Sequence, residues 1–150
     1  MNKIKKKLLV ECFHFLEEKT RILDEIIASN KLALLSETKS SAGDKHETGR
    51  AMLQLEMEKV STQFNDAHLM RVTLNRIDIR KKSDVVILGS LVKTSKGNYF
   101  LSVSIGKIIV DGIDFYCISV FSPIGKLLLG SKKDHEIYYN DMKIVVNDIY

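Results

Sequence analysis

The sequence predicts an α+β protein in which an antiparallel coiled-coil hairpin of two long helices precedes a small antiparallel sheet with one short helix. Three observations lead to this prediction: two apolar seams with heptad spacing, one polar loop between them, and short runs rich in β-branched and aromatic residues after Ile77. We expect the hairpin to occupy residues 1–80 with its tip at about 36–47. The sheet domain should occupy residues 81–150, with a linker near 78–83.

The two seams predict the helices of the hairpin. In the first, six of eight positions are apolar and steps of four and three alternate: Leu9, Phe13, Leu16, Thr20, Leu23, Ile27, Asn30 and Leu34. In the second, six of seven are apolar: Leu53, Met57, Val60, Phe64, Ala67, Arg71 and Leu74. Neither seam contains proline or glycine, so each helix of roughly 30 residues should be about 45 Å long. Two such helices close most simply as a hairpin, whereas an ordinary bundle usually needs more helices.

The carboxyl-terminal half shows strand signals. Five runs, DVVILGSLVKT, NYFLSVSIGKIIV, DFYCISV, HEIYY and MKIVVNDIY, are separated by turn sequences such as Asp-Gly and Asn-Asp, which predicts five or six mostly antiparallel strands. Between the third and fourth runs, Ser122 suits a helix cap, Pro123 suits the first helical position and Gly130 suits a helix stop. One short helix is therefore expected there.

Composition narrows the function classes. The formal charge is +4, and residues 1–80 hold 14 basic and 12 acidic side chains while residues 81–150 hold 9 and 7, so each part carries only +2. This even excess indicates weak or indirect DNA contact. The basic amino terminus leads into an apolar run that acidic residues interrupt, so we expect a cytoplasmic protein with no export signal and no membrane contact.

The sequence contains few signs of independent catalysis. It has no Walker A, GxGxxG, GxSxG or HExxH motif, and its four histidines do not share an HxxxH spacing. Cys12 and Cys117 lie far apart without a CxxC pair, which predicts two reduced thiols in the core rather than a disulfide framework or a zinc site. We expect no enzyme activity of the chain alone.

Two carboxylates in the predicted tip are the candidates for chemistry. Asp44 and Glu47 are three positions apart, so they share one side of the second helix if it begins there. The same spacing serves a capping box, which is the more frequent use of this pattern. Two carboxylates are too few for a tight Mg²⁺ site, but they could complete a site that a partner macromolecule half provides.

Two segments resemble a known family. The tip AGDKHETGR is similar to the glycine-aspartate-x-x-glutamate tip of bacterial Gre-type transcript cleavage factors, and FSPIGKLLLGSKKDHEIYY resembles a segment of their carboxyl-terminal domain. The order and spacing of both segments match, so the resemblance covers nearly the whole chain.

The resemblance implies a transcription elongation factor. Its sheet domain would be FKBP-like and would dock on RNA polymerase at the mouth of the secondary channel, with Ser122, Pro123 and Ile124 in the docking segment. The hairpin would enter the channel. There Asp44 and Glu47, near the RNA 3′ end, would hold a second Mg²⁺ jointly with the polymerase and assist cleavage of backtracked RNA.

The tip also departs from the family. After Glu47 the family continues with Asn-Ala-Glu-Tyr, whereas this chain has Thr-Gly-Arg-Ala, and residues 36–50 have zero formal charge because three acidic side chains face three basic ones. A near-neutral tip recruits cations less well. A regulator that occupies the channel without stimulating cleavage therefore stays open, as does an unrelated coiled-coil interaction module.

Overall fold

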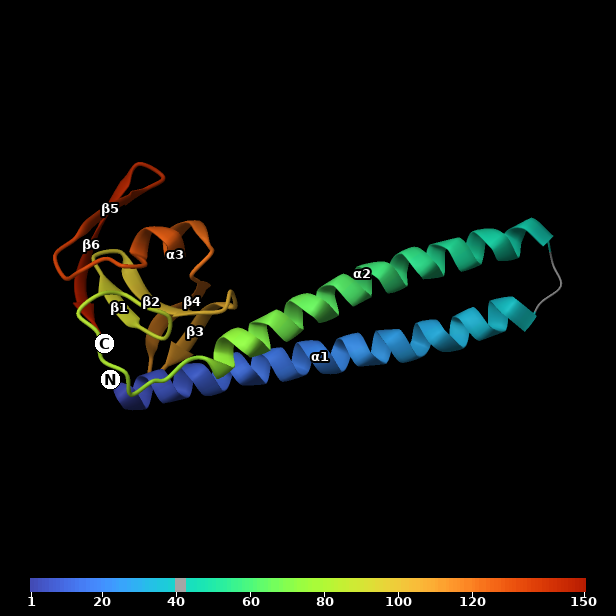
Figure 1. Cartoon of the computed structure of the whole chain (residues 1–150), viewed down its shortest axis with the longest axis horizontal. Coiled ribbons are helices and arrows are strands. Elements are labelled where there is room, and N and C mark those ends of the chain that lie inside the picture. The colour runs from blue at the N-terminus through green and yellow to red at the C-terminus, as the bar shows by residue number, and fades with distance from the viewer. Residues whose placement is uncertain (40–42) are drawn as a thin grey trace. The chain divides into compact units, whose positions relative to one another are not determined.

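The computed structural model confirms the α+β class, with two long helices followed by a six-stranded sheet and a short helix (Figure 1). It describes the backbone of residues 1–39 and 43–150 and the side chains of residues 1–36 and 47–150. The chain forms two compact units: Leu16–Met70 is the hairpin unit, and Met1–Phe15 with Arg71–Tyr150 is the sheet unit. The sequence also predicts a boundary near residue 80 between a hairpin domain and a sheet domain. That domain boundary stays a prediction.

The two long helices are α1, Asn2–Lys39, and α2, Gly43–Asn75. Both helices run into the stretch at 36–47 that was predicted as the tip loop, because its serine, lysine and glutamate residues are acceptable in a helix. Among the described residues, no helix has the length and apolarity needed to cross a membrane.

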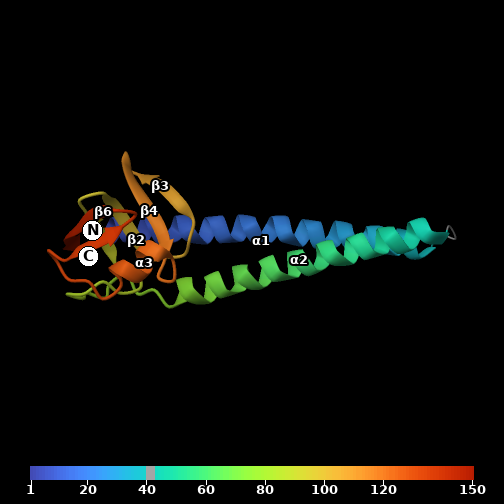
Figure 2. The same cartoon turned by 90° about the horizontal axis from the view of Figure 1, so that it is seen from above.

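The heptad prediction is confirmed at most seam positions of the hairpin unit, but Phe64 of the second seam is 37% exposed. Leu16, Leu23 and Asn30 of α1 and Val60 and Ala67 of α2 are buried, and the positions between them in the first seam are half-buried. Figures 1 and 2 show the two helices of this unit side by side and antiparallel. In this seam Asn30 is 7% exposed and its side-chain Nδ2 has no hydrogen-bond partner within the described residues. A buried asparagine at such a position disfavours other registers at a cost in stability.

The sheet contains six strands in the order β3-β4-β2-β1-β6-β5. Four of the five neighbouring pairs are antiparallel, and β2 with β4 is parallel, which agrees with the prediction of a mostly antiparallel sheet. The bounds are β1 Leu91–Thr94, β2 Gly97–Ser102, β3 Gly106–Val110, β4 Ile113–Ser119, β5 Glu136–Tyr139 and β6 Met142–Ile149, and the short helix α3 is Pro123–Leu128.

Glycines and tight turns explain the strand breaks. The run NYFLSVSIGKIIV divides into β2 and β3 between Ser102 and Gly106, where Gly106 adopts a φ of 95° that other residues rarely adopt, and this division makes six strands from five runs. Asp111 and Gly112, both with positive φ, close the β3–β4 hairpin as the Asp-Gly signal predicted. Asn140 and Asp141 close β5–β6 in the same way.

Side chains cover both faces of the sheet. On one face Val92, Leu101, Ile144 and Val146 form a core that includes Leu128 of α3. On the other face lie Leu91, Phe100, Phe115 and Cys117, which alternate with the first set along the strands and are also buried.

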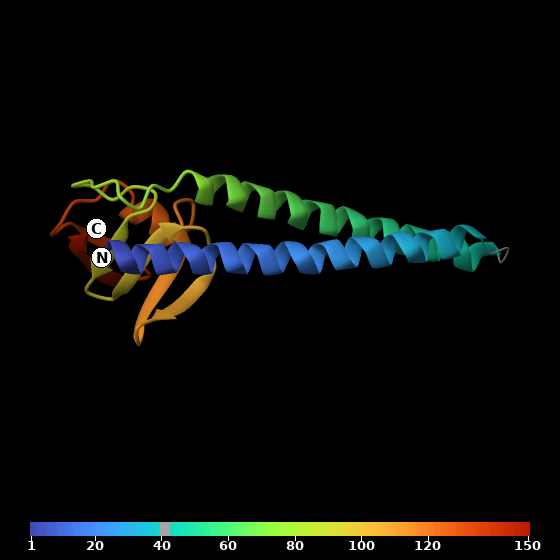
Figure 3. The same ribbon diagram turned by 90° about the horizontal axis from the view of Figure 1, so that it is seen from below.

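The first turns of α1 belong to the sheet unit (Figure 3). The Cys12 Sγ lies 3.7 Å from the Ser102 Oγ of β2. The Lys7 Nζ donates to Asp111 Oδ1 at 2.6 Å, and the Lys5 Nζ donates to the Tyr150 carbonyl oxygen at 3.2 Å. Since successive strand residues alternate between faces, Ser102 is on the same face as Phe100, and α1 therefore covers the face opposite α3.

Candidate functional site

The tip carboxylates lie at the start of α2. The helix begins at Gly43, so the backbone at positions 44 and 47 is helical, and these positions are one turn apart. Glu47 is exposed. The side chain of Asp44, together with Glu37 and the other side chains between 37 and 46, lies outside the described residues. The roles predicted for Asp44 and Glu47 in metal binding and catalysis therefore stay predictions.

The donor chemistry of the tip fits a shared magnesium site in part. Carboxylate oxygens are the ligands that Mg²⁺ prefers, but an octahedral ion needs more ligands than two residues supply. Within the described residues no group of three or more His, Cys, Asp or Glu side chains gathers to hold a metal. A site at the tip would need oxygen ligands from a partner.

The predicted docking segment forms the cap of α3. Ser122 is the N-cap: its Oγ accepts a hydrogen bond from the Gly125 N–H at 3.1 Å and donates one to the Ser119 carbonyl oxygen at 2.6 Å. Pro123 follows at the start of the helix, as predicted. Gly130 adopts a φ of 80° just after the helix and donates its N–H to the Val86 carbonyl oxygen at 2.8 Å.

The three residues of this segment differ in what they can offer a partner. Pro123 is exposed, Ser122 is half-buried and uses its hydroxyl in the cap, and Ile124 packs against the core. The structure brings them together within one turn. Their role in docking stays a prediction.

Exposed apolar side chains lie on and beside the same helix, and they were not among the predicted docking residues. Phe121 is 77% exposed, and Leu127 and Leu129 are also exposed, whereas Leu128 between them is buried. A helix of six residues presents only one face to the core, so three consecutive leucines cannot all be buried. The Leu-Leu-Leu run was therefore the available sequence signal for an apolar surface beside Pro123.

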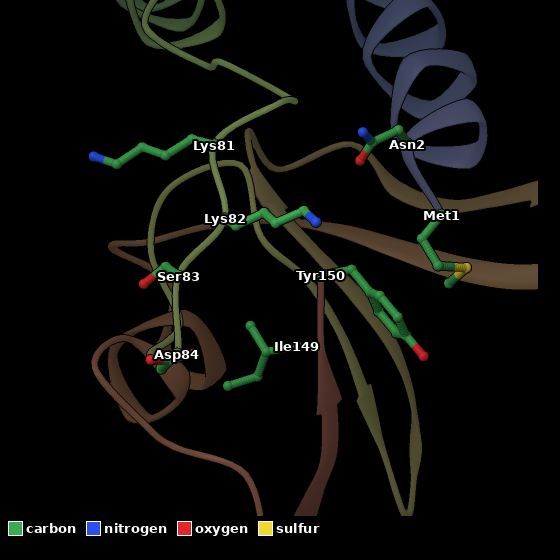
Figure 4. A pocket seen from close by; sticks show the side chains of 8 residues that line it. All are labelled: Met1, Asn2, Lys81, Lys82, Ser83, Asp84, Ile149 and Tyr150. Atoms are coloured by element: carbon green, nitrogen blue, oxygen red, sulfur yellow. The ribbon is translucent and has the colours of Figure 1, made fainter.

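A cavity of about 600 Å³ lies elsewhere on the sheet unit (Figure 4). Lys82 extends across it in this view while Lys81 points away. The eight residues that form its wall are Met1, Asn2, Lys81, Lys82, Ser83, Asp84, Ile149 and Tyr150. This set contains neither a thiol nor an imidazole, and a lone carboxylate beside lysines gives no nucleophile with an adjacent base.

A second depression of about 510 Å³ lies between the first turns of α1 and the edge strand β3. Val10 and Val110 contribute apolar surface to it, and Lys3 and Lys6 contribute charge. Lys7 in the same wall is already paired with Asp111. These side chains form a mixed surface without the geometry of a catalytic site.

Of the comparisons with known proteins, the one with solved structures finds similarity. No protein-family model and no curated protein matches the chain. Among solved structures, the chain is similar to "Structure of the transcription factor Gfh1", with 19% sequence identity over 99% of this chain and 92% of that chain and a TM-score of 0.34. A likeness of this size does not establish a shared activity.

Proposed function

We propose that this protein is a transcription elongation factor that binds RNA polymerase, inserts its hairpin into the secondary channel and assists Mg²⁺-dependent cleavage of backtracked RNA. The observation that carries the proposal is the position of the Asp44 and Glu47 pair, one turn apart where α2 begins after α1 ends at Lys39. The similarity of the tip and of the Ser122 segment to Gre-type factors supports the same proposal.

The length of the hairpin and the two carboxylates at its tip both suit insertion into the channel. The helical part of α1 within the hairpin unit, residues 16–39, is about 36 Å long at the helical rise per residue. Such a helix pair can carry two carboxylates into a narrow channel while the sheet unit stays outside. The exposed Pro123 and Phe121 give the sheet unit an apolar surface for docking on the polymerase.

In the proposed mechanism, Asp44 and Glu47 act as ligands and as orienting groups. Bound jointly by the tip and the polymerase, Mg²⁺ would supply Lewis-acid activation of the attacking water. The two carboxylates would fix the ligand geometry and place negative charge beside the RNA 3′ end. The chain alone would bind Mg²⁺ weakly, because it contributes too few oxygen ligands.

The test is RNA cleavage in halted, backtracked elongation complexes. Wild type should stimulate Mg²⁺-dependent cleavage, and the double variant Asp44→Asn, Glu47→Gln should reduce the stimulated rate about a hundredfold or more while polymerase binding survives. Both substitutions keep the side-chain size and remove the charge, so a loss of cleavage reports a loss of metal assistance.

A matched control removes the same charges from the body of α2. Glu58→Gln with Asp66→Asn changes two exposed carboxylates of the same helix and should leave cleavage unchanged. Wild type that adds nothing to the intrinsic polymerase rate would exclude the cleavage role.

The near-neutral tip favours a second candidate function. Three basic residues, Lys39, Lys45 and Arg50, balance the acidic residues between 36 and 50, so the tip could occupy the channel without recruiting a cation. In that case wild type binds polymerase and does not stimulate cleavage. If the carboxylates only cap α2, Asp44→Ala should cost about 1 kcal/mol of folding stability and change nothing else.

A further inference from the structure

Two thiols from distant parts of the sequence meet inside the sheet unit. Cys12 lies on α1 and Cys117 lies on β4, both are free, and their exposed fractions are 0% and 1%. Each thiol lies close enough to the other, and to the Ser102 hydroxyl, to shift the pKa of its neighbour. The Ser102 hydroxyl of β2 completes the cluster, with its Oγ 3.7 Å from the Cys12 Sγ.

The register of the sheet explains why Cys117 and Ser102 lie on the face that Cys12 covers. In the parallel β2–β4 pair, Phe100 is opposite Cys117 and Ser102 is opposite Ser119. Partners in a ladder share a face, and residues two apart along a strand share it too, so Ser102 and Cys117 are on the face that α1 covers. Leu8 and Cys12 are one turn apart on the covered side of α1, and both are fully buried.

The pKa values of the two thiols are shifted in opposite directions. Hydrogen bonds from Cys117 and then from Ser102 lower the pKa of Cys12, although burial and the Glu11 carboxylate act in the opposite direction. The hydrogen bond to Cys12 and burial raise the pKa of Cys117 far above its ordinary value. Cys12 is therefore the more acidic thiol of the pair. A thiolate beside a second thiol is the arrangement of reactive dithiol sites.

We propose that Cys12 and Cys117 are a reversible dithiol–disulfide site that peroxide oxidises and small thiols reduce, and that its oxidised form ties the first turns of α1 covalently to β4. Hydrogen peroxide suits a buried pair because it is close to water in size. The proposal is independent of the polymerase function proposed above.

The oxidation balances in two steps. The Cys12 thiolate attacks one peroxide oxygen, the O–O bond breaks, hydroxide leaves, and Cys12 becomes a sulfenic acid. Cys117 then attacks the Cys12 sulfur, and the departing hydroxide takes the Cys117 proton as water. In total, two thiols and one hydrogen peroxide give one disulfide and two waters. Two equivalents of a small thiol reverse the reaction through a mixed disulfide.

Little movement is required. Because Cys12 lies against Ser102 on the face that also carries Cys117, a shift of the first turns of α1 toward the sheet would bring the two sulfurs to a bond length of about 2.05 Å. The bond would close a long loop between residues 12 and 117 and would restrict the unfolded chain. The oxidised protein should therefore melt at a higher temperature.

The experiment treats the full chain with hydrogen peroxide, denatures it and counts free thiols, with intact mass measured in parallel. Because the chain has only 2 cysteines, a monomer that has lost both thiols and the mass of two hydrogens contains this disulfide and no other. We expect that product, its reversal by dithiothreitol, a raised melting temperature and slower amide exchange in residues 2–15. Two titratable thiols after treatment, or mainly disulfide-linked dimers, would overturn the proposal.

Single-cysteine variants distinguish the thiol that attacks peroxide, Cys12, from the thiol that closes the disulfide, Cys117. Cys117→Ser should leave a Cys12 sulfenic acid that dimedone captures, whereas Cys12→Ser should react with peroxide at least several-fold more slowly. Serine keeps a hydroxyl in the cluster, and circular dichroism checks that each variant is folded. Equal rates in the two variants would contradict the assigned roles, and the wild-type mass measurement decides the disulfide even if a variant fails to fold.

Discussion

At the residue scale, the burial of Lys5 makes the free energy of unfolding depend on pH. Its side chain is 1% exposed, and its Nζ donates to the Tyr150 carbonyl oxygen at 3.2 Å. Burial lowers the pKa of Lys5 below its ordinary value of 10.5, and the Asp78 carboxylate partly offsets the change by raising it. Folding therefore favours the neutral amine relative to the unfolded chain.

The sign of the pH effect follows from proton binding. Between the lowered folded-state pKa of Lys5 and 10.5, the unfolded chain binds more protons than the folded chain, so the free energy of unfolding rises with pH in that window. We expect this rise in wild type relative to Lys5→Met, measured by urea unfolding from neutral pH to pH 10.5. Lys6→Met, which removes an exposed lysine from the same turn, controls for the lost charge. Parallel curves for wild type and Lys5→Met would contradict the expectation.

At the element scale, α3 depends on one glycine. A Cβ at Gly125 would lie 1.9 Å from the Ser119 carbonyl oxygen and 2.8 Å from the Ser122 Oγ, the two atoms that build the cap. Helix propensity alone favours alanine over glycine by about 1 kcal/mol. The clash reverses the sign, so Gly125→Ala should destabilise the sheet unit by about 1–3 kcal/mol.

Denaturant unfolding tests the role of Gly125. Lys126→Ala, at the next and exposed position of α3, should change stability by less than about 0.5 kcal/mol. If Ser122 and Pro123 dock on polymerase, Gly125→Ala should also weaken binding more than Lys126→Ala does. Equal stability of the two variants would show that the cap can shift to accept a methyl group.

Periodicity and turn chemistry allowed most elements to be predicted. Both seams are helical, the Asp-Gly and Asn-Asp pairs form turns with positive φ, and Ser122 caps α3. These signals are local, because each reports which residues face the same way or which backbone angles are allowed. They do not report which surface covers an apolar face.

The pairing of distant segments could not be predicted for that reason. The lysines of KIKKK are alike in sequence, yet Lys5 alone is buried because it shares a helix face with Leu8 and Cys12. Cys12 and Cys117 have no local motif, and their proximity arises because α1 packs at Ser102 on the face that the β2–β4 register gives to Cys117. At the tip, the spacing of Asp44 and Glu47 fits both a cap and a metal site, and spacing in the sequence does not distinguish these two uses.

At the scale of the whole molecule, the sheet unit is built from two stretches of chain. Met1–Phe15 belongs to it although the hairpin unit, Leu16–Met70, intervenes. The first turns of α1 cover a face that contains Leu91, Phe100 and Phe115, each 0–1% exposed. Full burial of one such side chain stabilises a fold by about 1.5–3 kcal/mol, so a fragment that begins at residue 81 lacks the cover for several of them.

Two fragments test this dependence. Residues 81–150 alone should bind a hydrophobic dye and unfold at a lower urea concentration, or without a cooperative transition, because Leu8 and Cys12 no longer cover Phe100 and its neighbours. A chain that joins residues 1–15 to residues 71–150 through a flexible Gly-Ser linker should unfold cooperatively, since it keeps both stretches of the unit. Circular dichroism during urea titration measures both.

If residues 81–150 were as stable as the joined chain, the first turns of α1 would be dispensable and the predicted boundary near residue 80 would be a true domain boundary. The joined chain is also the appropriate fragment for polymerase binding, because a failure of residues 81–150 to bind could reflect unfolding rather than the absence of a docking surface.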